Sequence, residues 1–218
     1  MHGKAKRNKV FFLKCFIPNG VNIGGYNMES LKTDFLLDAR GLACPMPIVK
    51  TKKAMNDLQA GQVLEVQATD KGSKADIQAW ANSSGHQYLG TIEEGDLLKH
   101  YLRKSSNEGS IERKHPHVTS NEDLEKKLEA NENIVVLDVR EAAEYAFNHI
   151  PDAISIPLGE LEERHSELDT NDEIYVVCRT GSRSDLAAQK LAEIGFANVL
   201  NVVPGMSAWS GKTTSVNK

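Results

Sequence analysis

The sequence predicts an α/β protein of two domains that are joined by a polar linker. Its 218 residues are enough for two small domains, each with its own core. A polar stretch at 105–119, which contains glycine and proline but no apolar periodicity, divides the chain. On both sides of it, short apolar strands alternate with helical patterns. In the second half the strands are apolar enough to predict a parallel sheet with helices on both faces.

The first domain, expected at 33–104, is predicted to be a compact α/β unit. Its second helix begins at what resembles a capping box, in which Ser73 and Asp76 stand at the required spacing. Gly61 stands where a helix-ending glycine belongs. In chain order, the expected elements are a strand at 35–39, a helix within 44–61, a strand at 63–68, a helix at 77–85 and two weaker strands at 86–90 and 97–104.

The second domain is expected at 120–212. Ser120 and Asp123 suggest a capping box before its first helix. The last helix should end at Gly195 and bury Ala187, Leu191 and Ile194 along one face. The expected strands lie at 133–139, 173–177 and 198–203, and the expected helices at 123–130, 140–149, 158–165 and 184–195.

Composition excludes several functions. The formal charge of −4 argues against direct binding to nucleic acid or to an anionic membrane, and no apolar run approaches the about 18 residues of a membrane helix. The three cysteines, Cys15, Cys44 and Cys178, are odd in number and far apart. Reduced thiols in the cytoplasm are therefore expected. The pair His115 and His117 makes a poor metal site without a third ligand, and the sequence calls for no metal or cofactor.

Residues 1–27 differ from the rest of the chain. They carry basic but no acidic side chains, and Lys14 interrupts the apolar run that a signal peptide would need. Codons for Gly24 and Gly25 can contain a bacterial ribosome-binding sequence a short distance before Met28. We therefore expect this extension to be untranslated, with Met28 as the start and Cys15 without a role.

Cys178 follows the apolar strand EIYVV and precedes the loop RTGSRS. Ligands of open α/β sheets bind at the carboxyl ends of the strands. Gly181 lets the loop curl so that its N–H groups point inward, and Arg179 and Arg183 add positive charge. These surroundings favour a thiolate or a bound oxyanion. The loop residues expected to bind substrate are Arg179, Thr180, Gly181, Ser182 and Arg183.

The spacing within this loop separates two chemistries. Tyrosine phosphatases place five residues between cysteine and arginine, whereas here four separate Cys178 from Arg183. The shorter loop resembles that of the rhodanese family, which carries sulfur as a cysteine persulfide. LDVRE around Asp138 and Arg140, HIPDAISIPL at 149–158 and GMSAW at 205–209 extend the resemblance. It implies a rhodanese fold for 120–212 and a structural role for His149, because family members work without a histidine base.

Cys44 lies in GLACPMPIVK, before two prolines at the start of a helix. LDARGLACPMPIVKTKKAM resembles the TusA/SirA-like sulfur carriers, whose mark is a cysteine in C-P-x-P. Asp70, Ser73, Asp76 and Gly85 continue that resemblance. It implies a two-layer sandwich with Cys44 exposed at a helix N-terminus, where we expect the helix dipole and free N–H groups to favour a thiolate.

The combined pattern predicts a thiosulfate sulfurtransferase of the rhodanese type. Thiosulfate or a related sulfane-sulfur donor loads Cys178, and Cys44 relays the sulfur to a thiol acceptor, which can be a protein. The alternative is a sulfur carrier or persulfide sensor that a separate enzyme loads. A phosphatase or arsenate reductase is disfavoured by the loop spacing. The donor, the acceptor, the direction of transfer and the oligomeric state are open at this level.

Overall fold

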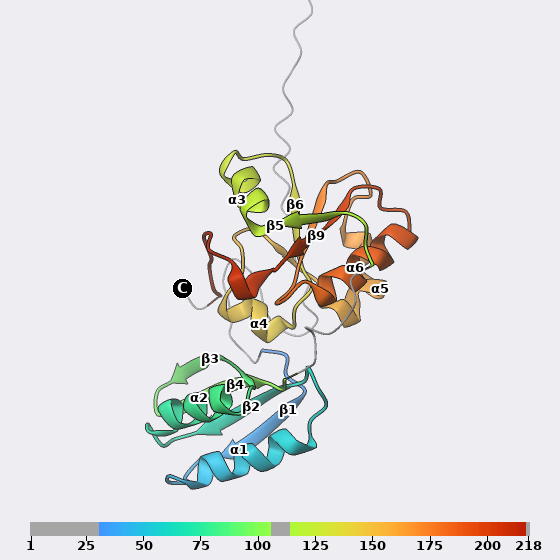
Figure 1. Ribbon diagram of the computed structural model, residues 1–218. Coiled ribbons are helices and arrows are strands. Elements are labelled where there is room, and N and C mark those ends of the chain that lie inside the picture. The colour runs from blue at the N-terminus through green and yellow to red at the C-terminus, as the bar shows by residue number, and fades with distance from the viewer. Residues whose placement is uncertain (1–30, 106–113, 217–218) are drawn as a thin grey trace, which may run out of the picture. The chain divides into compact units, whose positions relative to one another are not determined.

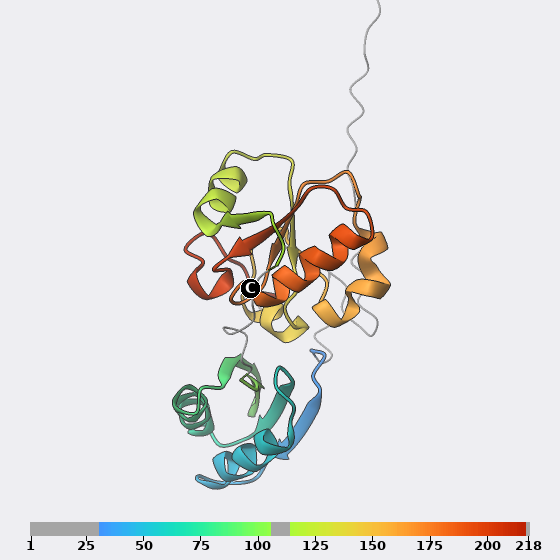
Figure 2. The same ribbon diagram turned by 45° about the vertical axis from the view of Figure 1, so that its right-hand side comes forward.

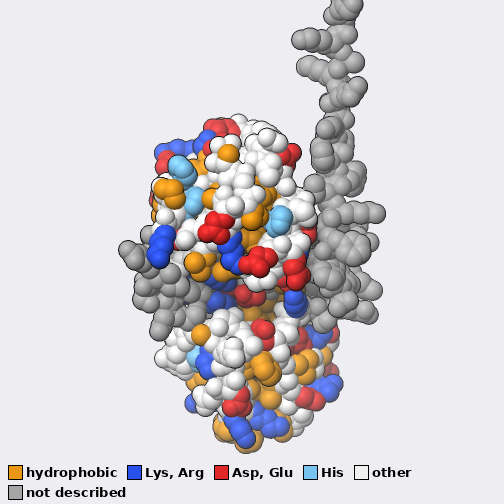
Figure 3. All heavy atoms as spheres, turned by 90° about the vertical axis from the view of Figure 1, so that its right-hand side faces the viewer, with side chains coloured by type: hydrophobic (Ala, Val, Ile, Leu, Met, Phe, Trp, Pro, Cys, Tyr) orange, Lys and Arg blue, Asp and Glu red, His pale blue; other side chains and the backbone are white. Residues whose placement is uncertain are grey.

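The computed structural model describes residues 31–105 and 114–216. The expectation for the extension at 1–27 lies outside these residues, as does much of the predicted linker. Among the described residues no helix is long and apolar enough to span a bilayer. On the face drawn in Figure 3, Lys and Arg side chains are interspersed with Asp and Glu.

The first domain is a two-layer α/β sandwich, as the sequence predicts. Its sheet has the order β1-β2-β4-β3, in which β1 is parallel to β2 and the other neighbours are antiparallel. Helices α1 and α2 pack on this sheet (Figures 1 and 2). The apolar cluster between them and the sheet includes Met55, Ile77, Leu64 and Leu102. The elements are β1 (Phe35–Ala39), α1 (Met46–Asp57), β2 (Val63–Ala68), α2 (Ser73–Ser83), β3 (Gln87–Glu94) and β4 (Leu97–Arg103).

The start of α2 differs from the prediction. The helix begins at Ser73 itself and its N-cap is Gly72, which has no side chain to cap it. Ser73 donates its hydroxyl proton to the carbonyl oxygen of Asp70, 2.6 Å away. Asp76, the expected partner of the capping box, is therefore released for another contact. The capping box fails because both residues already lie inside the first turn.

The second domain has a parallel sheet with the order β5-β9-β8-β6-β7. Central strands β6 and β8 are almost wholly buried, which explains their continuous apolar sequence. The elements are β5 (Val118–Ser120), α3 (Asn121–Glu129), β6 (Val135–Asp138), α4 (Ala142–Phe147), β7 (Ile154–Ser155), α5 (Leu161–Arg164), β8 (Ile174–Val177), α6 (Ser182–Glu193) and β9 (Val199–Val203), with 3-10 turns η2 (Leu158–Glu160), η3 (His165–Glu167) and η4 (Met206–Ala208).

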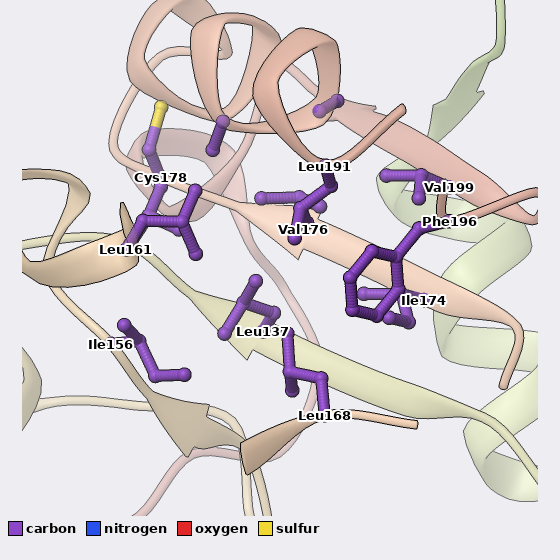
Figure 4. Packing of buried hydrophobic residues seen from close by; sticks show 13 residues of the cluster. Leu137, Ile156, Leu161, Leu168, Ile174, Val176, Cys178, Leu191, Phe196 and Val199 are labelled. Atoms are coloured by element: carbon purple, nitrogen blue, oxygen red, sulfur yellow. The ribbon is translucent and has the colours of Figure 1, made fainter. Parts of the chain in front are cut away.

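Two apolar clusters cover the two faces of this sheet. One joins the sheet to α5 and α6 and includes Leu161 and Leu191 (Figure 4). The other joins the sheet to α3 and α4 and includes Leu124 and Tyr145. The predicted arrangement with helices on both faces is confirmed. The prediction that Ile194 is buried is wrong: it is 49% exposed, because α6 ends at Glu193 and Ile194 lies at its C-cap.

The end of the predicted linker belongs to this domain. The backbone N–H groups of Lys114 and His115 donate to the Asp185 carboxylate, each at a distance of 3.0 Å. The buried His115 ring contacts the carbonyl oxygen of Val199 through Nε2, at 2.8 Å. Strand β5 then starts at Val118, inside the range expected as linker. Ser120 caps α3 as predicted, accepting from the N–H of Asp123.

Candidate functional site

Cys178 follows β8 at the carboxyl end of the parallel sheet. The loop turns at Gly181, whose φ of 90° is in the left-handed region that favours glycine. This turn directs the Gly181 N–H to the Cys178 sulfur, and the nitrogen lies 3.1 Å from the sulfur. The sulfur lies beyond the apolar side chains that fill the cluster beneath it (Figure 4), and Cys178 is fully buried. The loop thus gives the Cys178 sulfur a hydrogen-bond donor.

The other loop residues have different surroundings. Arg179 is exposed, Thr180 is half-buried and Ser182 is buried at the start of α6. Arg183 is also buried, and its guanidinium donates to Glu144 through Nη1 to Oε2 at 2.8 Å and Nη2 to Oε1 at 3.1 Å. The sequence predicts that Arg183 binds substrate. In the structure its two terminal nitrogens donate to a carboxylate of α4.

The Glu144–Arg183 pair is strongly coupled. Burial by itself raises the pKa of Glu144, but the hydrogen bonds and positive charge of Arg183 outweigh it, and the pKa falls to about 2. Glu144 is therefore ionised at neutral pH and neutralises the guanidinium beside the loop. This leaves Arg179 as the loop arginine that faces solvent.

A second turn holds the Cys178 loop from outside. The N–H groups of Met206 and Ser207 donate to the carbonyl oxygens of Cys178 and Arg179, at 2.8 and 2.9 Å. A Cβ on Gly205 would lie 2.5 Å from the Cys178 carbonyl oxygen, so only glycine permits this approach. The GMSAW stretch thus fixes the backbone at Cys178.

Cys44 is exposed and lies just before α1. Its thiol donates to Asp76 Oδ2 over 3.4 Å, and this hydrogen bond raises the pKa of Cys44, together with partial desolvation and the charges of Asp76 and Asp70. The expectation that the helix terminus favours a thiolate here is therefore wrong for this arrangement. The nearby carboxylate favours the protonated thiol.

A buried hydrogen-bond chain supports the helix that carries Asp76. Since the Ser73 hydroxyl proton goes to the Asp70 carbonyl oxygen, the Ser73 oxygen must accept from His100 Nε2, 2.9 Å away. His100 Nδ1 then faces the hydroxyls of Tyr88 and Thr91. Burial lowers the pKa of His100 to about 4, in agreement with a neutral ring. This chain links the first turn of α2 to strands β3 and β4.

Comparisons with known proteins identify both domains. The family model for sulfurtransferase TusA matches residues 36–104, and that for the rhodanese-like domain matches 120–212. YrkF of Bacillus subtilis, described by name as a sulfur carrier, is 54% identical over 84% of this chain and 99% of its own. This chain belongs to the TusA–rhodanese family of sulfur carriers and sulfurtransferases. Two shorter Bacillus subtilis relatives match parts of it: YrkI, named as a sulfur carrier, is 61% identical over 34% of this chain and 99% of its own, and YtwF, named as a sulfurtransferase, is 42% identical over 43% and 90%.

The other rhodanese motifs have structural partners. Asp138 and Arg140 form a buried ion pair, with Arg140 Nη2 2.6 Å from Asp138 Oδ2 and the same distance from the Asn148 carbonyl oxygen. His149 stacks on Tyr145 and bonds to the Tyr145 carbonyl oxygen through Nδ1 at 2.7 Å. These contacts support the structural role expected for His149.

Sequence reasoning missed several residues around Cys178 in the rhodanese domain. Ser184 lies 3.3 Å from its sulfur, and Asn201 on β9 lies 2.6 Å from the Ser184 hydroxyl. Asn201 is a polar residue in the apolar strand NVLNVV, which is a signal that could have identified it. Glu144 is harder to identify from the sequence. A glutamate in a short helix is ordinarily exposed, so nothing in its position predicts that it is buried.

Proposed function

We propose that this chain is a rhodanese-type sulfurtransferase that loads Cys178 from thiosulfate or a related sulfane-sulfur donor and passes the sulfur to Cys44. The observation that carries the proposal is the buried Cys178 sulfur with the Gly181 N–H aimed at it. A buried thiol of purely structural function does not need a left-handed glycine turn that directs a donor to its sulfur.

Loading is a displacement at sulfur. The Cys178 thiolate attacks the sulfane sulfur of thiosulfate, the S–S bond of thiosulfate breaks, and sulfite leaves with the bonding electron pair. Cys178 then carries a persulfide whose outer sulfur holds the negative charge. In this proposal the exposed Arg179 attracts the anionic donor, and the N–H groups of the loop and of the first turn of α6 stabilise the charge. Arg183 acts by holding the loop through Glu144.

Unloading transfers the outer sulfur. The Cys44 thiolate attacks it, the sulfur–sulfur bond to Cys178 breaks, and Cys178 leaves as a thiolate. The proton of the Cys44 thiol goes to Asp76 or to water before the attack. A linker between the domains raises the effective concentration of one thiol near the other to roughly the millimolar range. Cys44 then delivers sulfur to an acceptor thiol, which can belong to a protein.

A second candidate deserves a separate test. Cys44 is exposed, whereas Cys178 is buried, and relatives are named as sulfur carriers. These facts favour a carrier that a separate enzyme loads directly at Cys44. Free thiosulfate would then be a poor substrate. Since both described cysteines are free thiols, we expect either reaction to occur in the reducing cytoplasm.

Thiosulfate loading followed by peptide mass spectrometry separates the two. Wild type, Cys178→Ser and Cys44→Ser are incubated with thiosulfate and digested without reductant. The relay requires added sulfur on both cysteines in wild type, on Cys178 alone in Cys44→Ser, and on neither in Cys178→Ser. Thiosulfate:cyanide transfer should be lost in Cys178→Ser and largely kept in Cys44→Ser, because cyanide can take sulfur directly from Cys178. Added sulfur on Cys178 but never on Cys44 would refute the relay.

A further inference from the structure

The hydroxyl of Ser184 lies between two acceptors. Its oxygen is 2.6 Å from Asn201 Oδ1 and 3.3 Å from the Cys178 sulfur, and all three residues are fully buried. A serine hydroxyl carries one proton, so it can donate to only one of the two at a time. The position of this proton therefore depends on the state of the sulfur.

The orientation of the Asn201 amide follows from its other contacts. Asn201 Nδ2 lies 3.1 Å from the Gly181 carbonyl oxygen and 3.4 Å from Asp185 Oδ1. Both of these atoms are acceptors, so the amide nitrogen must face them. Asn201 Oδ1 then faces Ser184, and the 2.6 Å contact between the two oxygens needs the serine proton. In the thiol state the Ser184 oxygen accordingly presents a lone pair to the sulfur, and the Cys178 S–H can donate a hydrogen bond to it.

Ionisation of Cys178 reverses this preference. A thiolate opposite a lone pair is repelled, whereas a thiolate opposite an O–H gains a charge-assisted hydrogen bond. We propose that Ser184 is a catalytic residue whose hydroxyl rotates whenever the Cys178 sulfur becomes a thiolate. Its O–H then donates to this sulfur and no longer to Asn201 Oδ1. No bond is broken in this step other than the hydrogen bond to Asn201. The inference rests on the proposed function only in saying which steps it assists.

The charged groups around the sulfur have other partners. Arg183 is paired with Glu144. The carboxylate of Asp185, one turn into α6, accepts from the backbone N–H groups of Lys114 and His115. Arg179 is exposed on the loop. The Gly181 N–H and the Ser184 hydroxyl are therefore neutral donors at the sulfur. Of these two, the hydroxyl can rotate when the charge on the sulfur changes.

The switch acts on a particular step of sulfur transfer. In the persulfide the charge moves to the outer sulfur, so Ser184 returns to Asn201. When Cys178 is expelled as a thiolate, Ser184 turns back and stabilises the leaving group. Loading needs the thiolate as nucleophile, so it is assisted only at a pH where the thiol would otherwise be protonated. Unloading is assisted at every pH.

The test compares Ser184→Ala with Ser184→Thr, which keeps a hydroxyl, and with Ser210→Ala, an exposed serine of the same domain. Thiolate ultraviolet absorbance, measured against Cys178→Ser, reports ionisation without any sulfur donor. Ser184→Ala should lower the thiolate content and the rate of Cys178 alkylation at neutral pH by about three- to tenfold. The alkylation defect should vanish at high pH. Ser184→Thr should restore both values, and Ser210→Ala should not change them.

Asn201→Leu gives a prediction of opposite sign. Without the competing Asn201 oxygen the Ser184 hydroxyl keeps its hydrogen bond to the Cys178 sulfur, so the thiolate content at neutral pH should rise. Urea unfolding shows whether Asn201→Leu is folded. If it is not, the comparison of Ser184→Ala with wild type tests the switch by itself. Unchanged ionisation and alkylation in a folded Ser184→Ala would overturn the switch. If thiosulfate loads no variant, wild type included, while the ionisation differences persist, the proposed function fails and the switch stands.

Discussion

Removal of the Glu144 carboxylate should destabilise the rhodanese domain. Glu144 is 2% exposed and accepts two hydrogen bonds from Arg183. Glu144→Ala leaves the guanidinium buried without these bonds. Breaking a buried ion pair in this way costs about 3–5 kcal/mol of unfolding free energy.

The pKa of Glu144 gives an independent estimate of the same order. It falls from 4.5 to about 2 on folding, which corresponds to about 3 kcal/mol of stability at neutral pH. Because the folded pKa is the lower one, this contribution is fully present above about pH 4.5. It is lost as the pH falls from there through 2. The stability difference between wild type and Glu144→Ala should therefore shrink by about half at pH 3.

Urea unfolding followed by tryptophan fluorescence measures this difference. The chain has two tryptophans, Trp80 in the TusA domain and Trp209 in the rhodanese domain. A Trp80→Phe background therefore reports the rhodanese domain alone. A loss below about 1 kcal/mol at pH 7, or a difference between the two proteins that stays constant down to pH 3, would refute the reasoning.

Three further predictions concern other contacts. Asp76→Asn removes the carboxylate whose hydrogen bond and charge raise the pKa of Cys44, so this pKa should fall and alkylation of Cys44 at neutral pH should accelerate; an unchanged pH–rate profile would contradict this. Gly205→Ala places a Cβ 2.5 Å from the Cys178 carbonyl oxygen at a φ of 79°, and should cost on the order of 1–3 kcal/mol in urea unfolding and lower sulfur transfer, whereas wild-type values would mean that the turn can shift. The pKa of His100 is lowered to about 4 by folding, so the TusA domain should lose stability as the pH falls from about 6.5 through 4, and His100→Gln should abolish that dependence.

The sequence by itself determined the order and type of the main elements. The continuous apolar strands 135–138 and 174–177 predicted a buried parallel sheet, because only a strand covered on both faces lacks polar alternation. The two cysteine motifs located Cys44 before a helix and Cys178 after a strand. These are local properties, since periodicity and turn residues act over a few positions along the chain.

The tertiary structure decided which side chains meet. Asp76 and Cys44 are 32 positions apart, and Glu144 and Arg183 are 39 apart. In each case a local pattern suggested another partner: a helix cap for Asp76 and a bound anion for Arg183. Ser184 on α6 and Asn201 on β9 come together because α6 packs against β9, the strand beside β8. Local sequence sets the backbone, but the partner of a polar side chain depends on strand order and helix packing, which bring distant residues within hydrogen-bond distance.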